Sequence, residues 1–264
     1  MNDYLVAVIL GIVEGLTEFL PISSTGHLIL AQRLLGVSGT AWETFEIMIQ
    51  LGAILAVVCI YFRKLWSVLI SLPSNPASRH FALLLLVALL PSLVLGALFG
   101  GSIKSYLFNP FIVGLTLILG GLIILAVEAM HKVARFRAVE EMTLGTALVV
   151  GLVQTVSMIP GTSRSGATIV GGLLLGLDRR TATEFSFFLA IPTMVAAFGH
   201  EALSHADTMN FDQIGLIAVG FVTSFIAALL IVKPFLEFVS RVGFGPFAYY
   251  RIALGTLVLT VMYL

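Results

Sequence analysis

The sequence has 264 residues, of which 59% are hydrophobic and 11% are charged. Soluble domains are about 45–50% apolar and about 25% charged, so this composition, with a mean hydropathy of +1.07, excludes a soluble protein and predicts one membrane domain over residues 1–264. The 14 basic and 14 acidic residues cancel, which argues against a nucleic-acid partner because such proteins carry a basic excess.

The first residues, Met1, Asn2 and Asp3, lack the basic region of a cleaved signal peptide. We therefore expect the first apolar segment to belong to the mature protein. The one cysteine, Cys59, lies in an apolar run. It excludes a disulfide framework and a thiolate metal site, and we expect it to be buried or to face lipid.

Ten apolar segments follow along the chain, at about residues 4–20, 24–37, 46–62, 81–99, 110–130, 143–159, 166–177, 184–200, 214–236 and 246–264. A helix needs about 20 residues to cross a bilayer, and the third, fourth, fifth, eighth, ninth and tenth segments suffice as six full spans. The other four form two pairs, each with a polar interruption followed by a segment too short to span. We predict two re-entrant helix hairpins, whose non-helical backbone must be buried in protein or line a wet cavity.

Basic residues indicate the orientation. They gather in the loops 63–80 and 131–141 and at three further positions: Arg63, Lys64, Arg79, Lys132, Arg135, Arg137, Arg179, Arg180 and Arg241. The loop 201–213 instead carries Glu201, Asp207 and Asp212. Because basic loops stay in the cytoplasm, we expect both termini to lie outside, the first hairpin to enter from outside and the second from the cytoplasm.

The two halves of the sequence match at an offset of 140 residues. The offset aligns Gly11 with Gly151, Ser23 with Ser163, Gly26 with Gly166, Leu35-Gly36 with Leu175-Gly176, and Phe45 with Phe185. We predict an inverted-topology repeat, with one unit over about 4–130 and the other over about 143–264. Transporters with such repeats place their sites where broken helices meet near the midplane; chance matching in an apolar chain is the alternative.

The first interruption reads EGLTEFLPISSTGH over residues 14–27. Glu14 and Glu18 are four residues apart and share a helix face. Each ionised acid near the bilayer centre costs at least about 2.5–3.5 kcal/mol, so a cation, a metal or a shared proton must offset them.

The second interruption reads QTVSMIPGTSRSGAT over residues 154–168 and carries Arg164. An arginine in a buried loop needs an anionic partner, and its guanidinium fork suits phosphate. Glu14 or Glu18 is the other available partner, in which case the ion pair would be structural.

Both interruptions lead into a short helix through small polar residues: Ser23, Ser24, Thr25 and Gly26 in the first, and Ser163, Arg164, Ser165 and Gly166 in the second. Helix N-termini bind anions, although serine and threonine there are also ordinary N-caps. With the two acids and His27, these termini favour metal-assisted phosphate chemistry. Glu14 and Glu18 would hold Mg²⁺ or Ca²⁺, and His27 would act as general acid or base or as nucleophile.

Further polar residues lie outside the two interruptions. Four of them either support the site or join helices by hydrogen bonds: Glu46, Gln50, Glu184 and Ser186. Four near span ends are expected to snorkel: Lys104, Glu128, Lys233 and Arg251. The glycine pairs 120–121 and 171–172 are expected to permit close helix packing, and His80, His131, His200 and His205 carry no site signal.

The two interruptions, EGLTEFLPISSTGH and PGTSRSGAT (160–168), resemble the signature regions of the bacterial undecaprenyl pyrophosphate phosphatases, the bacitracin-resistance family. The resemblance covers the whole chain. It implies hydrolysis of undecaprenyl diphosphate to undecaprenyl phosphate and phosphate, which recycles the lipid carrier of peptidoglycan synthesis. It also implies a divalent cation, a location in the bacterial inner membrane and a site open to the periplasm.

The motif positions imply these functional residues: Glu14, Glu18, Ser24, His27, Ser163, Arg164 and Thr168. We assign catalysis to Glu14, Glu18, Ser24, His27 and Arg164, with the metal on the two acids. Phosphate binding is assigned to Ser23, Thr25, Gly26, Ser163, Arg164, Ser165, Gly166 and Thr168. The nucleophile stays open between Ser24, His27 and water, and a homodimer is possible.

Three other classes of protein compete with this interpretation. A transporter or flippase for a prenyl phosphate lipid shares the expected architecture but releases no phosphate. A type 2 phosphatidic acid phosphatase is rejected, because no His follows Ser163-Arg164 within a few residues and no Lys-x6-Arg-Pro motif occurs. A purely structural membrane subunit is disfavoured by two buried acids and a buried arginine.

Overall fold

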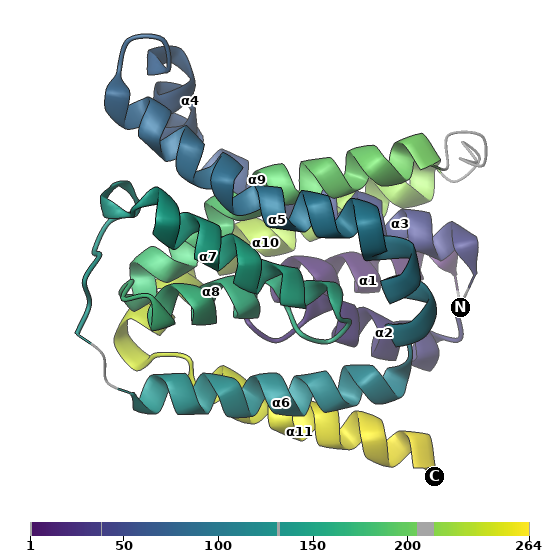
Figure 1. The fold of residues 1–264 in the computed structure, drawn as a ribbon. Coiled ribbons are helices and arrows are strands. Elements are labelled where there is room, and N and C mark those ends of the chain that lie inside the picture. Colours follow the sequence, from purple (N-terminus) through teal and green to yellow (C-terminus); the bar gives the residue numbers. More distant parts are fainter. Residues whose placement is uncertain (1, 38, 131–132, 205–213, 264) are drawn as a thin grey trace.

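The computed structural model describes residues 2–37, 39–130, 133–204 and 214–263, and its regular elements there are helices (Figure 1). The first half contains α1 (Asp3–Thr17), α2 (Ser24–Leu35), α3 (Thr40–Ile60), α4 (Phe62–Ser71), α5 (Pro76–Leu107) and α6 (Pro110–Ala129). The second contains α7 (Leu144–Gln154), α8 (Arg164–Leu174), α9 (Arg179–Ser204), α10 (Ile214–Val242) and α11 (Gly245–Tyr263), with the 3₁₀ turns η1 (Val139–Glu141) and η2 (Thr155–Met158). The all-α prediction is confirmed.

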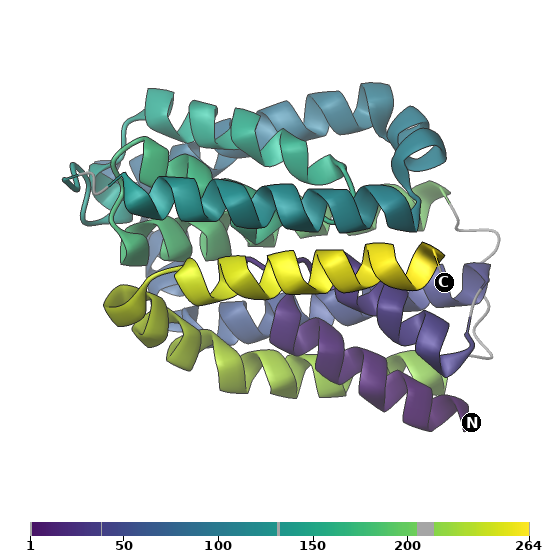
Figure 2. The same cartoon turned by 90° about the horizontal axis from the view of Figure 1, so that it is seen from below.

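Within the described ranges, four helical stretches are long and apolar enough to cross a membrane: Pro76–Ile103, Pro110–Ala129, Arg179–Gly199 and Ile214–Val242. A fifth span results if α3 and α4, bent by 76°, are counted together. The sixth expected span, 246–264, corresponds to α11, which lies along α6 (Figures 1 and 2) but is not among these stretches. The chain is a multi-pass helical membrane protein.

The expectation of a loop over residues 63–80 is wrong in its first half, where α4 forms. No residue of α4 is buried, and its large apolar side chains Phe62, Trp66 and Leu69 are exposed. Lys64 on the same helix forms a 2.7 Å ion pair with Glu140 of η1. A short helix with one apolar and one basic face is typical of a membrane interface, and the hydropathy of the segment alone did not reveal it.

The two ends of the helical bundle carry different elements. The N- and C-termini lie at one end, whereas α4, residues 133–143 and the α10–α11 turn lie at the other (Figure 1). The basic segments and the termini are therefore at opposite ends, as the orientation rule predicts. Expectations for His131, Lys132, His205, Asp207 and Asp212 fall outside the described residues.

Two helix–turn–helix hairpins are present as expected, and we name them hairpin 1 (residues 3–35) and hairpin 2 (residues 144–174). Hairpin 1 opens toward the end with the termini and hairpin 2 toward the other end (Figure 1). Their first helices cross a neighbour at backbone contact: a Cβ on Gly11 would overlap the Gly220 carbonyl of α10, and one on Gly151 would overlap the Ala88 carbonyl of α5. Aligned glycines thus seat both hairpins in the bundle.

Candidate active site

Each hairpin turns through a serine with a left-handed backbone. Ser23 (φ 68°) and Ser163 (φ 73°) are the two non-glycine residues with positive φ in the described chain. Such a conformation is uncommon for a residue with a side chain. Ser23 Oγ accepts the Gly26 N–H at 3.3 Å, and Ser163 Oγ accepts the Gly166 N–H at 3.1 Å. Both serines are therefore N-caps, and these two glycine N–H groups are already paired with them.

The connecting segments, which we name the first tip (residues 18–23) and the second tip (residues 155–163), lie close together. Arg164, directly after the second tip, donates from Nη2 to Glu18 Oε1 at 2.9 Å. The Glu18 and Arg164 side chains are only 5% and 11% exposed. The two hairpins therefore meet in a buried ion pair, which involves Glu18 and is one of the alternatives that the sequence left open.

Arg164 keeps part of its donor capacity free. Its Nη1 donates to the Ser186 carbonyl of α9 at 2.9 Å, whereas its buried Nε has no partner among the described residues. A buried, unpaired charged donor is costly. The Nε atom is thus available to an anionic ligand.

Ser24 lies beside a potential base. Its Oγ donates to Glu18 Oε2 at 2.6 Å, and both groups are buried. Glu18 thus receives Arg164 on one oxygen and Ser24 on the other. A hydroxyl within hydrogen-bond reach of a carboxylate is the arrangement of an activated nucleophile.

Glu14 is fully buried, and neither of its carboxylate oxygens has a hydrogen-bond partner in the described chain. Its nearest electrostatic neighbours include Glu18, Glu46 and Arg164. An orphaned buried carboxylate beside two other acids requires a cation or a proton. This pair of hard oxygen donors fits Mg²⁺ or Ca²⁺, although no group of three or more His, Cys, Asp or Glu gathers in the part of the chain that is described.

His27 is fixed at both nitrogens. Its Nδ1 lies 2.7 Å from the Ser23 carbonyl oxygen, and because a carbonyl only accepts, Nδ1 carries the hydrogen. Its Nε2 lies 2.7 Å from the Tyr250 hydroxyl, and the two rings stack with centroids 5.6 Å apart. Nε2 is therefore the basic nitrogen of a neutral His27, and Tyr250 is a site residue that sequence reasoning missed.

Two further predicted residues, Ser165 and Thr168, lie on α8 directly after the second tip. Ser165 donates to the Leu20 carbonyl of the first tip at 2.8 Å and lies 3.0 Å from Ser163 Oγ. Thr168 donates to Ser186 Oγ at 2.7 Å. Ser165 thus ties α8 to the first tip, and Thr168 ties α8 to α9. Thr25, the counterpart of Ser165 in hairpin 1, lies on α2 and is half-buried.

The structure distinguishes the roles of Glu46, Gln50, Glu184 and Ser186, which the sequence left open between supporting the site and joining helices. Ser186 belongs to the site through Arg164 and Thr168. Glu46 accepts a hydrogen bond from Gln32 and interacts with Glu14. Glu184 instead contacts Arg180 at 3.3 Å and Tyr61 at 3.5 Å, away from the tips. Gln50 is half-buried on α3.

The expectation that Arg251 snorkels is wrong. It is 1% exposed and donates to five backbone carbonyls, those of Pro21, Thr116, Leu117, Gly161 and Thr162. Gly120 makes room for it, because a Cβ there would overlap the guanidinium. A Cβ on Gly121 would overlap the Ala248 carbonyl of α11, so the close helix packing expected at the glycine pair 120–121 is confirmed.

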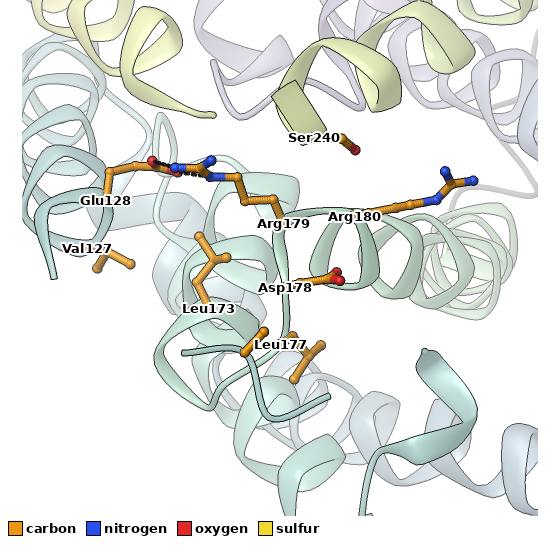
Figure 3. A pocket seen from close by; sticks show the side chains of 9 residues that line it. Val127, Glu128, Leu173, Leu177, Asp178, Arg179, Arg180 and Ser240 are labelled. Carbon is orange, nitrogen blue, oxygen red and sulfur yellow. Dashed lines mark hydrogen bonds and ion pairs between the residues drawn. The ribbon is translucent and has the colours of Figure 1, made fainter. Parts of the chain in front are cut away.

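Glu128 does not snorkel either. Its carboxylate pairs with Arg179 through two hydrogen bonds, of 3.1 and 2.5 Å, at the edge of a cavity of about 590 Å³ (Figure 3). Arg180 points away from that pair (Figure 3). None of the cavity's lining residues belongs to either tip, so it is separate from the site. Lys233 is exposed as expected, and the Lys104 side chain lies outside the described part.

An apolar groove of about 490 Å³ runs beside the second tip. It lies between the C-terminal part of α5 and η2, and it is lined by Leu95, Phe99, Ser102, Ile103, Tyr106, Leu107, Thr155, Met158 and Ile159. Ile159 is five residues before Arg164. The apolar groove therefore borders the second tip, which leads directly into Arg164.

The fold and site define a class: a multi-pass helical membrane protein in which two helical hairpins bring a carboxylate, a hydroxyl and a guanidinium into contact inside the bundle, with a second acid and an imidazole on the same hairpin as that carboxylate. The sequence matches the family "Bacitracin resistance protein BacA" over residues 7–257. The chain belongs to this family.

Curated relatives support that assignment over nearly the whole chain. An undecaprenyl-diphosphatase of Rhodopseudomonas palustris (strain BisB18) is 51% identical over 258 residues, 97% of this chain and 96% of the relative. One of Bradyrhizobium diazoefficiens is 51% identical over 259 residues, 97% of both chains. One of Caulobacter sp. (strain K31) is 46% identical over 267 residues, 100% of this chain and 99% of the relative. The family resemblance inferred from the two motifs is confirmed.

Proposed function

We propose that this chain is an enzyme that hydrolyses undecaprenyl diphosphate to undecaprenyl phosphate and inorganic phosphate. The relatives that bear this activity's name match it end to end. The observation that carries the proposal is the junction of the tips, where Glu18, Ser24 and Arg164 from opposed hairpins are in contact inside the bundle. The activity recycles the lipid carrier of peptidoglycan and counters bacitracin, and a flippase is not favoured.

Arg164 is the proposed phosphate ligand. Two observations support this role. The buried Nε atom has no partner among the described residues, and the hydrogen bond from Nη1 to the Ser186 carbonyl orients the guanidinium. A diphosphate carries more negative charge than Glu18 alone and accepts bidentate hydrogen bonds. Binding would draw Arg164 onto the phosphates and free Glu18 Oε1.

The 2.6 Å contact with Glu18 supports Ser24 as the nucleophile. In the proposed step the Ser24 proton passes to Glu18 while Oγ bonds to the terminal phosphorus. The bond from that phosphorus to the bridging oxygen breaks, and undecaprenyl phosphate leaves with that oxygen. Water then attacks the phosphoserine with His27 Nε2 as base, after the Tyr250 hydroxyl turns its hydrogen away from that nitrogen. Phosphate leaves, and Ser24 regains its proton from Glu18. Direct attack by water is the competing pathway, distinguished by trapping the phosphoserine.

Glu14 is the proposed ligand for Mg²⁺ or Ca²⁺, with Glu18 as the second carboxylate. Its two orphaned, buried oxygens support this. When bound, the cation would neutralise charge on the phosphates. Glu14 itself would contribute one negative charge to holding it.

We propose that the prenyl chain lies in the apolar groove along α5. Its border with the second tip supports this, since a chain leaving a phosphate held by Arg164 must pass into an apolar environment. The proposed location is the bacterial inner membrane, with hairpin 1, the site entrance and both termini on the periplasmic side. The basic segments at the opposite end of the bundle support that orientation.

The test is phosphate release from undecaprenyl diphosphate by purified protein in detergent, with Mg²⁺, with Ca²⁺ and with EDTA. The proposal expects metal-dependent release that falls to a small residual rate in Arg164→Ala and Glu18→Gln proteins that elute from a sizing column as wild type does. Substrate binding without release would instead indicate a transporter. Neither binding nor release would mean that the polar tips are structural.

A further inference from the structure

Arg251 lies outside both hairpins and contacts both tips. From α11, its Nη1 donates to the Pro21 carbonyl of the first tip at 3.0 Å. Its Nη2 donates to Gly161 and Thr162 of the second tip at 3.1 and 2.9 Å. Its remaining bonds reach two carbonyls of α6. One guanidinium therefore links three segments around the Glu18–Arg164 pair.

The hydrogen-bond partners of Arg251 are backbone carbonyls, and its side chain is almost fully buried. Non-helical carbonyls at this depth need donors, and Arg251 supplies them to both tips at once. A planar fork with five N–H groups can do this. Lysine has a single nitrogen and cannot span the same set of carbonyls.

The neighbouring residue, Tyr250, acts on the first hairpin only. Its ring lies nearly parallel to the His27 imidazole, at an interplanar angle of 4°, and its hydroxyl lies 2.7 Å from Nε2. The Ser23 carbonyl fixes the opposite edge of the imidazole. The plane of His27 is thus set by one contact within hairpin 1 and one from α11.

We infer that Tyr250 and Arg251 are positioning residues of the site. Arg251 holds the two tips in register, and Tyr250 sets the plane and direction of His27 Nε2. The inference rests on the proposed phosphatase activity but concerns residues that neither motif contains. It makes α11, which reaches both tips through Arg251 and His27 of α2 through Tyr250, part of the catalytic apparatus of hairpins 1 and 2.

The Arg251 arm is tested with Arg251→Lys, which keeps the charge, and with Arg241→Lys, an exposed arginine on α10, as matched control. We expect kcat for phosphate release to fall about 100-fold, as for a misaligned catalytic group, with KM changed less than about threefold. We expect the control to match wild type. Because Arg251 acts through the Glu18–Arg164 pair, Arg251→Lys combined with Glu18→Gln should lose little more than Glu18→Gln alone.

The Tyr250 arm uses a graded series. Tyr250→Phe keeps the ring and should lose roughly threefold in kcat, whereas Tyr250→Leu should lose roughly 30-fold because the stacked contact is also gone. Neither change should lower the residual rate of a His27→Ala protein further. Tyr249→Phe, at the adjacent exposed tyrosine, should equal wild type.

The outcomes separate the inference from the proposed function. Absence of phosphate release by wild type would overturn the proposed function. Suppose instead that wild type releases phosphate, and that the loss of kcat from Arg251→Lys adds in full to that from Glu18→Gln, and the loss from the Tyr250 changes to that from His27→Ala. That result would leave the function intact and overturn the positioning roles. Arg251→Lys protein of lowered melting temperature but normal kcat per folded molecule would also overturn the inference, because it would show a purely structural role.

Discussion

Hairpins 1 and 2 turn through serines with similar φ values, 68° at Ser23 and 73° at Ser163, and each serine caps the helix that follows. The side chains around this shared turn differ at matching positions 140 residues apart, which pair Glu14 with Gln154, Glu18 with Met158, Ser24 with Arg164, and His27 with Ala167. Hairpin 1 carries the acids, the hydroxyl and the imidazole. Hairpin 2 carries the guanidinium and, at Met158, the wall of the apolar groove.

Electrostatics explains why the two hairpins are complementary rather than identical. Two hairpins with both acids would bury four carboxylates, and two hairpins with arginine would bury two guanidinium groups. Either arrangement leaves like charges without water. In the observed arrangement, Glu18 of hairpin 1 pairs with Arg164 of hairpin 2 at 2.9 Å. The shared backbone thus provides a scaffold, and the difference between the hairpins provides the chemistry.

The largest effect is expected from removing the charge of hairpin 2. Arg164→Ala should lower kcat/KM for undecaprenyl diphosphate by about 10³-fold, the scale for an arginine that stabilises phosphoryl charge. Arg164→Lys should lose at least about 10²-fold, since one nitrogen cannot replace the fork. Arg63→Ala, at an exposed position, is the control and should equal wild type. A loss of kcat/KM below tenfold for Arg164→Ala would contradict the claim that hairpin 2 supplies the phosphate ligand.

The next largest loss of activity is expected when Glu14 of hairpin 1 is replaced by the residue at the matching position of hairpin 2. Glu14→Gln introduces the residue found at position 154, and we expect about 10²-fold lower activity, as for loss of one electrostatic group. The apparent affinity for Mg²⁺, from release rates over a Mg²⁺ titration, should weaken. Gln154→Met should leave the cation dependence unchanged, because Gln154 donates to Ser92 and not to the tips. An unaltered Mg²⁺ titration in Glu14→Gln protein would refute the ligand assignment.

Because the two turns share one backbone conformation, we expect equal changes in stability when either serine is replaced. Replacing Ser23 or Ser163 with Ala removes the cap and keeps the strained Cβ, at a cost of about 1 kcal/mol. Replacement with Gly also removes the cap but relieves strain of about 1–2 kcal/mol. The Gly proteins should therefore unfold at higher denaturant concentration than the Ala proteins, by similar margins at both sites. An Ala protein at least as stable as its Gly counterpart would show that the turns are not strained.

Much of the site follows from local sequence pattern. Both hairpins, their short second helices and the residues Glu14, Glu18 and Arg164 stand out because polar groups interrupt apolar segments. Which acid meets Arg164 did not follow, since Glu14 and Glu18 share a helix face and only the packed bundle selects between them. The N–H groups of Gly26 and Gly166, expected to bind phosphate, are instead paired with the capping serines.

Arg251 and Tyr250 could not be found in this way. Arg251 lies 87 positions after Arg164, in an apolar segment near a span end, where snorkelling is the ordinary outcome. Its role depends on the crossing of α6 and α11 at Gly120, which is a tertiary feature. A signal was nevertheless present, because a Gly pair in one segment and a lone Arg in another suggest a pocket for a large side chain. The same limit applies to Ser186 and Glu184, two residues apart, of which only Ser186 joins the site.

The smallest effect concerns the hydroxyls that follow the two capping serines. Ser165 is fully buried and donates to Leu20 across the junction, so Ser165→Ala should cost about 1 kcal/mol. For a chain of this size that corresponds to a melting temperature lower by about 2–4 °C. Thr25, the matching residue, is half-buried, and Thr25→Val should lower the melting temperature by less than half as much. Equal losses would mean that the first tip is held as tightly by its own hydroxyl, and that the junction is more symmetric than its hydrogen bonds indicate.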